Sequence, residues 1–285
     1  NDPDRGRWTY VYDKMGRVRF QTDAKGLVTE FTYDLLGRKR TESVNGNTLN
    51  WYYDERSTSN PNVGKLTSLY DTLGYETFDY NNAGRVKKRV RRTDNNTFQF
   101  DYLYGAHGRK TRTTYPDGSI ASYQYDAAGR EKGLTGVVSN ITYNAQGQPK
   151  NITYGNGLVT TRVYSPQRGW LTDLSTPGLQ DFTYVRDAKG LISQQTSNID
   201  NQSWRYYYDM MDRLRNIDNV NDNNLDQSYD YDTIGNIIYN SKVGTYRYQE
   251  TNGAGPHAVS SIGGDTFKYD ANGNTVVRGN ATLTY

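Results

Sequence analysis

A six-residue pattern of tyrosine, aspartate, two variable residues, glycine and arginine returns along the whole chain. Its clearest copy is YDAAGR at residues 125–130. Tyr12 and Tyr33 begin two copies that lie 21 residues apart, and a second turn-like segment, TDAKG at residues 22–26, lies midway between them. Further near-copies begin at Tyr70, Tyr80, Tyr104, Tyr143, Tyr208, Tyr231 and Tyr269. A repeat of this length predicts an array of similar supersecondary units, each packed against its neighbours.

The pattern itself predicts a strand that runs into a tight turn. Aspartate or asparagine at the first turn position can accept a hydrogen bond from a backbone N–H two residues on. Glycine three residues later tolerates the positive φ that closes a type I turn with a bulge. We therefore expect a structural turn role for Tyr12, Asp13, Gly16, Arg17, Tyr33, Asp34, Gly37, Arg38, Tyr125, Asp126, Gly129, Arg130, Tyr231, Asp232, Gly235, Tyr269, Asp270 and Gly273.

Aromatic residues before these turns fall two positions apart, as in Phe31 and Tyr33 or Tyr123 and Tyr125. Period two places such residues on one face of a strand. Each repeat then reads as two short strands joined by hairpins, and no helix of useful length is expected. Hydrophobic residues make up only 34% of the chain, 27 of them tyrosine, and mean hydropathy is −0.93. The sequence therefore predicts an all-β fold, a hairpin ribbon one layer thick rather than a domain around a dry core.

Charge and composition exclude several classes of partner. The 34 basic and 31 acidic residues leave a net charge of +3, which does not favour nucleic acid. No apolar run is long enough for a membrane helix, so we expect no membrane insertion by this segment. The basic run at residues 87–92, KKRVRR, is either a polyanion patch or a strand with cations on both faces, and alternation of faces favours the second.

Residues suited to catalysis or metal binding are scarce. The chain has no cysteine and two histidines, His107 and His257, which fall in predicted turns. The polar segment at residues 218–226 could be a calcium loop, but it lacks the glycine and terminal glutamate of an EF-hand, so a solvated hairpin loop is favoured. The aspartates of the pattern have a structural role as turn residues. We therefore expect no enzyme, no catalytic or metal site and no cofactor.

The repeated set resembles the Rhs (YD-repeat) family of large bacterial proteins. The resemblance is carried by YDKMGR, TDAKG and FTYDLLGR near the start, and by GPHAVSSIGG and YDANGN near the end, so that it spans residues 12–274. It implies a β-strand ribbon that spirals into a hollow shell, or an arc of one, around a C-terminal and often toxic polypeptide. Relatives in the family include shell components of insecticidal toxin complexes, effectors loaded on secretion spikes, wall-associated toxins and teneurin adhesion receptors.

We accordingly expect residues 1–285 to form a single YD-repeat array, a fragment of a larger shell without the family's core segment, autoproteolytic site or effector. The resemblance implies that its partners are the rest of that shell and the enclosed effector, together with a secretion spike or toxin-complex component. It also implies a secreted or delivered location, in some relatives at the cell surface, and a role in competition between bacteria.

The function expected from this resemblance is non-enzymatic containment and shielding of a toxin until delivery. One alternative is an adhesion module whose exposed aromatic residues stack on sugars at a cell or wall surface. A weaker alternative is a hydrolase that uses the turn aspartates.

Overall fold

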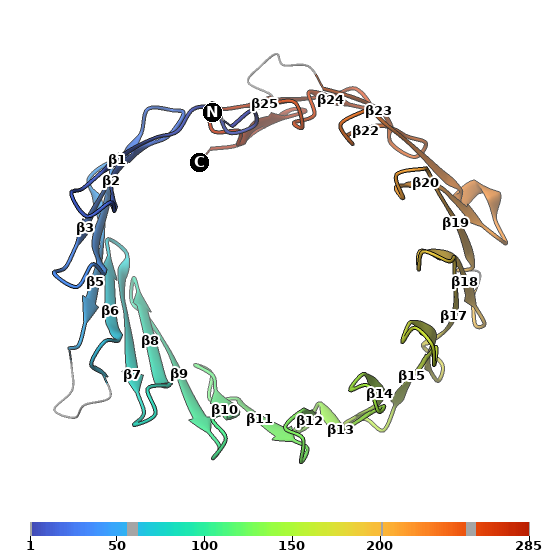
Figure 1. Cartoon of the computed structure of the whole chain (residues 1–285), viewed down its shortest axis with the longest axis horizontal. Helices are drawn as coiled ribbons and strands as arrows, with labels where there is room; N and C mark the ends of the chain where they lie inside the picture. The colour runs from blue at the N-terminus through green and yellow to red at the C-terminus, as the bar shows by residue number, and fades with distance from the viewer. Residues whose placement is uncertain (1, 56–61, 201, 249–254, 285) are drawn as a thin grey trace. The chain divides into compact units, whose positions relative to one another are not determined.

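The computed structural model is an array of short antiparallel strands joined by hairpins, shown in Figure 1. It describes residues 2–55, 62–200, 202–248 and 255–284. Across these ranges the structure contains 27 strands and no α-helix, and a short 3₁₀ turn, η2, spans Asn223–Leu225. The all-β fold predicted from the repeat is therefore confirmed.

The chain divides into two compact units, which are described separately. Unit 1 comprises residues 2–122 and 269–276, and unit 2 comprises residues 123–268 and 277–284. Unit 1 contains β1 (Thr9–Tyr12), β2 (Val18–Thr22), β3 (Val28–Tyr33), β4 (Lys39–Val44), β5 (Asn47–Tyr53), β6 (Leu66–Asp71), β7 (Gly74–Tyr80), β8 (Val86–Thr93), β9 (Asn96–Tyr104) and β10 (Lys110–Thr114).

Unit 2 contains β12 (Glu131–Leu134), β13 (Val138–Tyr143), β14 (Pro149–Tyr154), β15 (Val159–Tyr164), β16 (Leu171–Thr176), β17 (Gln180–Arg186), β18 (Ile192–Ser197), β19 (Trp204–Tyr208), β20 (Leu214–Asn219), β21 (Gln227–Tyr231), β22 (Ile237–Asn240), β23 (Gly244–Arg247), β24 (Ser261–Ile262) and β27 (Ala281–Thr282). Strands β11 (Ile120–Tyr125), β25 (Asp265–Tyr269) and β26 (Thr275–Arg278) each have residues in both units.

Within each unit, successive strands pair in an antiparallel ladder. In unit 1 the pairing runs from β1 with β2 to β10 with β11. At the end of many first strands the register shifts by one residue, as between Val11 and Tyr12 or between Thr32 and Tyr33. This shift is the bulge predicted for the motif turn, and Gly16 and Gly37 close it with φ values of 77° and 82°.

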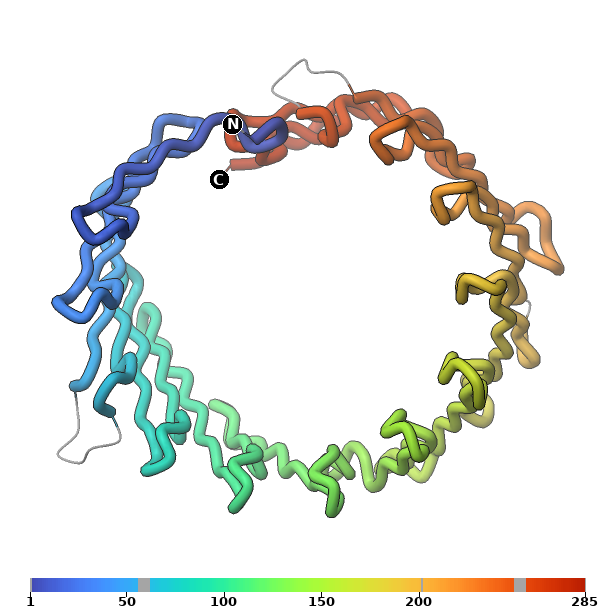
Figure 2. The backbone as a smooth tube through the Cα atoms, in the orientation of Figure 1, coloured from blue at the N-terminus to red at the C-terminus, as the bar shows by residue number. Residues whose placement is uncertain are grey.

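The alternation of hairpins gives the ribbon two edges, visible in Figure 2 as rows of chain reversals. We call the row that contains the motif turns the YD edge; in unit 1 it includes residues 13–16, 34–37, 81–84, 105–108 and 270–273. We call the opposite row the return edge; in unit 1 it includes residues 23–26, 72–73 and 115–118. Every second hairpin therefore lies on the same edge.

The interior of the ribbon is thin and polar. Among the described residues, every side chain classed as buried is polar, and Thr67 and Ser68 are the two that are fully enclosed. Aromatic and aliphatic side chains are half-buried or exposed, because a single sheet has no second layer to cover them. The absence of a thick apolar core was predicted from the composition.

One copy of the pattern does not form the turn on the YD edge that its sequence predicts. Tyr70 to Gly74 reads YDTLG, yet Asp71 pairs directly with Gly74 in the two-residue hairpin between β6 and β7. This hairpin lies on the return edge. The reason is spacing: Tyr70 precedes Tyr80 by only ten residues, half a repeat, so the strand between them reverses the direction of the chain.

Two glycines of unit 1 are expected to differ in their tolerance of a side chain. Gly16 has open space where a Cβ would lie, so Gly16→Ala should cost about 1 kcal/mol for its positive φ of 77° alone. At Gly74 a Cβ would lie 2.0 Å from the backbone oxygen of Arg92, so Gly74→Ala should cost about 2–4 kcal/mol. Urea denaturation of both variants checks the order; equal losses would contradict the close approach at Gly74.

Candidate functional site

The most regular arrangement of side chains in this protein joins each repeat to the next. It begins in the motif turn, where the aspartate organises its own hairpin. Asp13 Oδ1 accepts hydrogen bonds from the backbone N–H groups of Met15 (2.8 Å) and Arg17 (2.9 Å), while Gly16 N–H bonds to Asp13 O at 3.0 Å. The same bonds recur at Asp34, Asp209 and Asp232. The turn is therefore closed by local bonds that depend only on the spacing of the motif.

The arginine after the glycine continues this network toward the next repeat. Arg17 Nε donates to Asp13 Oδ2 at 2.7 Å, and its guanidinium lies 4.5 Å from the ring centroid of Tyr33, the motif tyrosine of the following repeat. The equivalent stacks are Arg38 on Tyr53 (4.2 Å), Arg130 on Tyr143 (4.3 Å) and Arg213 on Tyr231 (4.5 Å). Each arginine thus bridges an aspartate of its own turn and an aromatic ring of the next, which is a cation–π arrangement.

The tyrosine completes the connection by donating its hydroxyl hydrogen to the backbone of the preceding repeat. The acceptor is the carbonyl of the residue that directly follows the arginine position. Tyr33 bonds to Val18 O at 2.7 Å, Tyr104 to Val86 O at 2.7 Å and Tyr231 to Leu214 O at 2.7 Å. The same bond is made by Tyr80, Tyr143, Tyr164, Tyr208 and Tyr248. We call the aspartate, arginine, next tyrosine and acceptor carbonyl the repeat clasp.

Some repeats build the clasp without charge. In YNAQGQ, Asn144 Nδ2 donates to Gln148 Oε1 at 2.9 Å, and Gln148 Nε2 donates to Gly169 O of the next turn at 2.8 Å. Near the end of unit 2, Asn236 takes the arginine position and bonds both to Asp232 Oδ2 and to Pro256 O, each at 2.9 Å. In these repeats an amide side chain takes the place of the arginine and reaches both its own turn and the next one.

Electrostatics favour the charged form of the motif aspartates. The backbone N–H of Arg17, followed by its side chain, lowers the pKa of the Asp13 carboxyl, and Arg130 does the same for Asp126. The carboxylates of Asp54 and Asp34 raise the pKa of the Arg38 guanidinium, which bonds to both. Burial raises the pKa of the Tyr231 hydroxyl. These shifts follow from hydrogen bonds within a structural network.

The structure places the residues expected from the sequence to form turns as follows. Asp13, Asp34, Asp126 and Asp232 accept the backbone bonds of their own turns, and Asp270 does so from the N–H groups of Asn272 and Asn274. Arg17, Arg38 and Arg130 lie in clasps, and Gly129, Gly235 and Gly273 have positive φ. Tyr12 ends β1 before its turn and is 58% exposed. Tyr125 and Tyr269 end their strands before the turn.

Sequence reasoning missed Arg213, which forms a complete clasp with Asp209 and Tyr231. Its motif reads YDMMDR, so aspartate replaces the expected glycine, and Asp212 adopts the positive φ of 61° in its place. Aspartate is one of the few side chains that tolerate this conformation. The arginine at the last position of YDMMDR was the signal that could have identified this clasp.

The other sequence candidates take up ordinary places. His107 and His257 are exposed turn residues. In the 218–226 segment, Asn219, Asp222 and Asp226 use side-chain oxygens to accept backbone N–H groups of the same loop. No group of three metal-binding side chains occurs among the residues that the structure describes. Nor does any helix in those ranges have the length and apolarity to cross a membrane.

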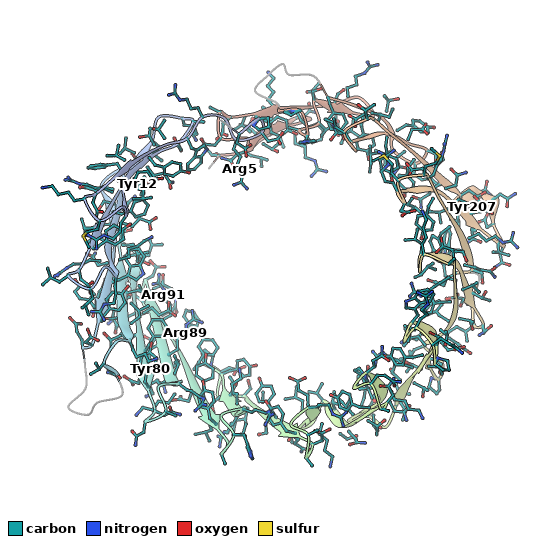
Figure 3. The ribbon with its side chains drawn as sticks, in the orientation of Figure 1. Arg5, Tyr12, Tyr80, Arg89, Arg91 and Tyr207 are labelled. Carbon is teal, nitrogen blue, oxygen red and sulfur yellow. The ribbon has the colours of Figure 1, made fainter. Side chains whose placement is uncertain are left out.

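The basic run lies on β8 and has acidic neighbours. Arg89 pairs with Glu76, Arg91 with Asp71 at 2.8 Å, and Lys88 stands opposite Asp79 and Asp101 in the ladder. Figure 3 shows Arg89 and Arg91, two residues apart on the strand, on the same side of the sheet. Three of the five cations in the run therefore have acidic partners or neighbours on the flanking strands.

Two hollows in unit 1 combine aromatic and charged groups. One, of about 320 Å³, is lined by Asp2, Arg5, Gly6, Trp8 and Tyr10. The other, of about 220 Å³, lies at the clasp of Asp34, Arg38 and Tyr53, with Trp51 beside it. In the second hollow one face of the Tyr53 ring is already covered by Arg38, whereas Tyr10 in the first is 46% exposed.

Comparison with curated proteins finds toxins. The chain is 32% identical over 229 residues to double-stranded DNA deaminase toxin A of Burkholderia cenocepacia, a match that covers 75% of this chain and 15% of that protein. It is 27% identical over 179 residues to the tRNA3(Ser)-specific nuclease WapA of Bacillus spizizenii, covering 59% of this chain and 7% of the nuclease. The chain thus spans a small part of these relatives. No family model matches the chain.

Comparison with solved structures identifies the fold. A chain of the Photorhabdus luminescens Tc holotoxin pore superposes with a TM-score of 0.67 at 20% identity, over 96% of this chain and 15% of its own length. A chain of the TcdB2–TccC3 structure gives a TM-score of 0.60 at 18% identity over 97% of this chain. This chain carries the repeat of the Rhs (YD-repeat) family. The clasp is thus how its Rhs repeats are joined.

The tyrosine hydroxyl of the clasp should contribute measurably to stability. Tyr231→Phe removes the donor to Leu214 O and should lower the free energy of unfolding by about 0.5–1 kcal/mol, because the acceptor is left half-buried without its partner. Tyr207→Phe is the matched control, since Tyr207, labelled in Figure 3, is 46% exposed. Thermal denaturation followed by circular dichroism compares the two; equal effects would contradict the role of the Tyr231 bond.

The charged clasps should make stability depend on acidity. The pKa of Asp126 is lower in the folded chain than in the unfolded one, so its contribution is complete above about pH 4 and is lost as the pH falls through the folded value. Melting temperature should therefore fall steeply in acid. The double variant Asp126→Asn with Arg130→Gln copies the neutral turn of Asn144 and Gln148. Its melting temperature should fall less in acid than that of the unaltered chain. An unchanged pH profile would contradict the contribution of this clasp.

Proposed function

We propose that this chain is a wall segment of an Rhs-type toxin shell, and that the shell encloses and shields a toxic polypeptide until delivery. The observation that carries the proposal is the repeat clasp, which stabilises a sheet without a dry core. A sheet held by contacts between neighbouring repeats can extend as a wall with solvent or cargo against its faces. A domain that needed a central core could not be extended in this way.

The comparisons support the toxin setting of this proposal. The solved structures that share the fold come from Tc toxin assemblies, and the curated relatives are named as a deaminase toxin and tRNA nucleases. Those activities are named for whole proteins of which this chain matches a small part. The clasp residues have complete structural roles in their turns. We therefore assign the repeat segment a non-enzymatic role beside a separate toxic activity, in a protein that is secreted or delivered to its target.

The partners follow from the same proposal. They are further repeats of the same shell, the enclosed polypeptide, and a secretion or toxin-complex component that carries the shell. That residues 1–285 act as one array within such a shell also remains a proposal.

Limited proteolysis tests whether the shell contains a polypeptide. The experiment uses the longest natural protein that contains this segment. In the intact protein, peptides from the enclosed polypeptide should appear late in a limited digest, after those from exposed loops. Arg213→Ala removes the arginine of one clasp, so peptides from the enclosed polypeptide should appear earlier in the digest. Arg215→Ala is the matched control, because Arg215 is 64% exposed and lies 3.9 Å from Asp230. Early release of the cargo from the unaltered protein would contradict containment.

Carbohydrate binding is the second candidate, favoured by the hollow beside Trp8 and Tyr10. An exposed aromatic ring beside carboxylate and guanidinium groups is a usual arrangement for stacking on a sugar and bonding to its hydroxyls. Against it, Arg17, Arg38, Arg130 and Arg213 cover one ring face of the motif tyrosines they contact. Titration with cell-wall glycan fragments, with Tyr10→Ala as the variant, distinguishes the candidates: saturable binding lost in the variant would favour adhesion.

A further inference from the structure

Asparagine followed by glycine occurs four times in this chain, at residues 45–46, 156–157, 252–253 and 272–273. The pair at residues 252–253 lies outside the described residues. In such a pair the backbone nitrogen of the glycine can attack the side-chain amide carbon of the asparagine, because glycine has no Cβ to hinder the approach. The attack is easiest where neither the amide nor the backbone N–H is held by a hydrogen bond. The three described pairs differ in this respect.

The pair at residues 272–273 is held by hydrogen bonds to both of its reacting groups. Asn272 Nδ2 donates to Asp23 Oδ2 at 2.6 Å, and Asn272 Oδ1 is buried. The backbone N–H of Gly273 donates to Asp270 O at 3.0 Å. The attacking nitrogen and the amide would each have to leave a bonded position before they could react.

The pair at residues 156–157 is exposed to solvent but is also held. Asn156 Oδ1 accepts the backbone N–H of Leu158 at 3.1 Å, and the N–H of Gly157 donates to Tyr154 O at 3.0 Å. The pair at residues 45–46 is equally classed as exposed. Exposure therefore does not separate these two pairs, and a difference in their reactivity would arise from hydrogen bonding.

The pair at residues 45–46 forms the two-residue hairpin loop between β4 and β5, on the return edge of unit 1. Asn45 and Gly46 have φ values of 48° and 77°, as a type I′ turn requires, and Val44 pairs with Asn47 across the loop. Within the described part of the chain, neither the Asn45 side chain nor the Gly46 N–H makes a hydrogen bond. A Cβ on Gly46 would meet open space. Both reacting groups of this pair are therefore free to meet.

We propose that Asn45 is a site of spontaneous deamidation, from which the folded structure protects Asn156 and Asn272. The Gly46 nitrogen loses its proton to a solvent base and bonds to Asn45 Cγ. The bond from Cγ to Nδ2 then breaks, and ammonia leaves with a proton from solvent, which closes a cyclic succinimide. Water opens this ring at either carbonyl and gives aspartate or isoaspartate at position 45. This inference concerns one hairpin of the ribbon and does not depend on what the ribbon encloses.

Isoaspartate changes this hairpin more than aspartate does. Aspartate leaves the backbone unaltered, and it is a preferred residue before glycine in a type I′ turn. Isoaspartate carries the main chain through the former side chain and adds a carbon to it, in a loop whose length sets the register of the flanking strands. Ser43 and Thr48, whose hydroxyls bond at 2.9 Å, are paired directly beyond Val44 and Asn47. The modification therefore weakens the pairing of β4 with β5.

Peptide mapping by mass spectrometry tests the site in the folded chain. During incubation in mildly alkaline buffer, Asn45 should convert at least about tenfold faster than Asn156 or Asn272, because those two pairs must first break hydrogen bonds. The product at position 45 should accept a methyl group from an isoaspartyl methyltransferase. In urea the three pairs should convert at similar rates, since the fold no longer holds two of them. Equal rates in the folded chain, or a faster rate at Asn156 or Asn272, would overturn the proposal.

The melting temperature tests the effect on the hairpin. The unaltered chain should melt at a lower temperature after this incubation than before it. Fresh Asn45→Asp is the matched control for the added charge, and it should melt like the fresh unaltered chain. Asn45→Gln should keep its initial melting temperature through the incubation, because its longer side chain would have to close a larger and less favourable ring. An equal decline in Asn45→Gln would overturn the assigned effect on the pairing of β4 with β5.

Discussion

The structure depends on the arginine that lies between two repeats. Arg17, Arg38, Arg130 and Arg213 each bond to the aspartate of one turn and stack on the tyrosine of the next. A guanidinium suits this position because it is planar, always charged and able to donate in several directions at once. Tyr33, Tyr143 and Tyr231 each return a hydroxyl bond to the repeat that supplied the arginine. Successive hairpins are thereby tied in both directions.

Such ties explain how a sheet with a polar interior can be stable. The buried side chains among the described residues are polar, and apolar contacts are spread along the ribbon. Stability is then a sum over neighbouring repeats, and the loss of one tie weakens one junction. The variation among repeats fits this view, because the neutral pair Asn144 and Gln148 also joins its own turn to the next, through a hydrogen bond to Gly169 O instead of a ring contact. The residues at the aspartate and arginine positions of the motif can therefore vary as long as each repeat contacts the next.

The two edges of the ribbon follow from the same repetition. A hairpin array places every second turn on one edge, so residues at the variable motif positions gather in rows. On the YD edge these positions do not contribute to the clasp, so the clasp does not fix which residues occupy them. The exposed side chains of Met15, Leu35 and Leu36 lie at such positions, whereas the neighbouring Arg17 and Arg38 bond to Asp13 and Asp34 within their turns.

The sequence by itself determined the hairpins and their turns. Aspartate, glycine and the two residues between them close the turn through bonds within five residues, so the motif predicted its own local structure, including the positive φ of Gly16 and Gly37. Only the tertiary structure decided what each turn touches. The carbonyl of Val18 as acceptor for Tyr33, the stacking of Arg17 on that ring and the return-edge position of Asp71 all depend on strand register. The packing of residues 270–273 on residues 23–26 joins segments far apart in the chain, and a turn motif cannot specify it because the motif's own bonds span only about five residues.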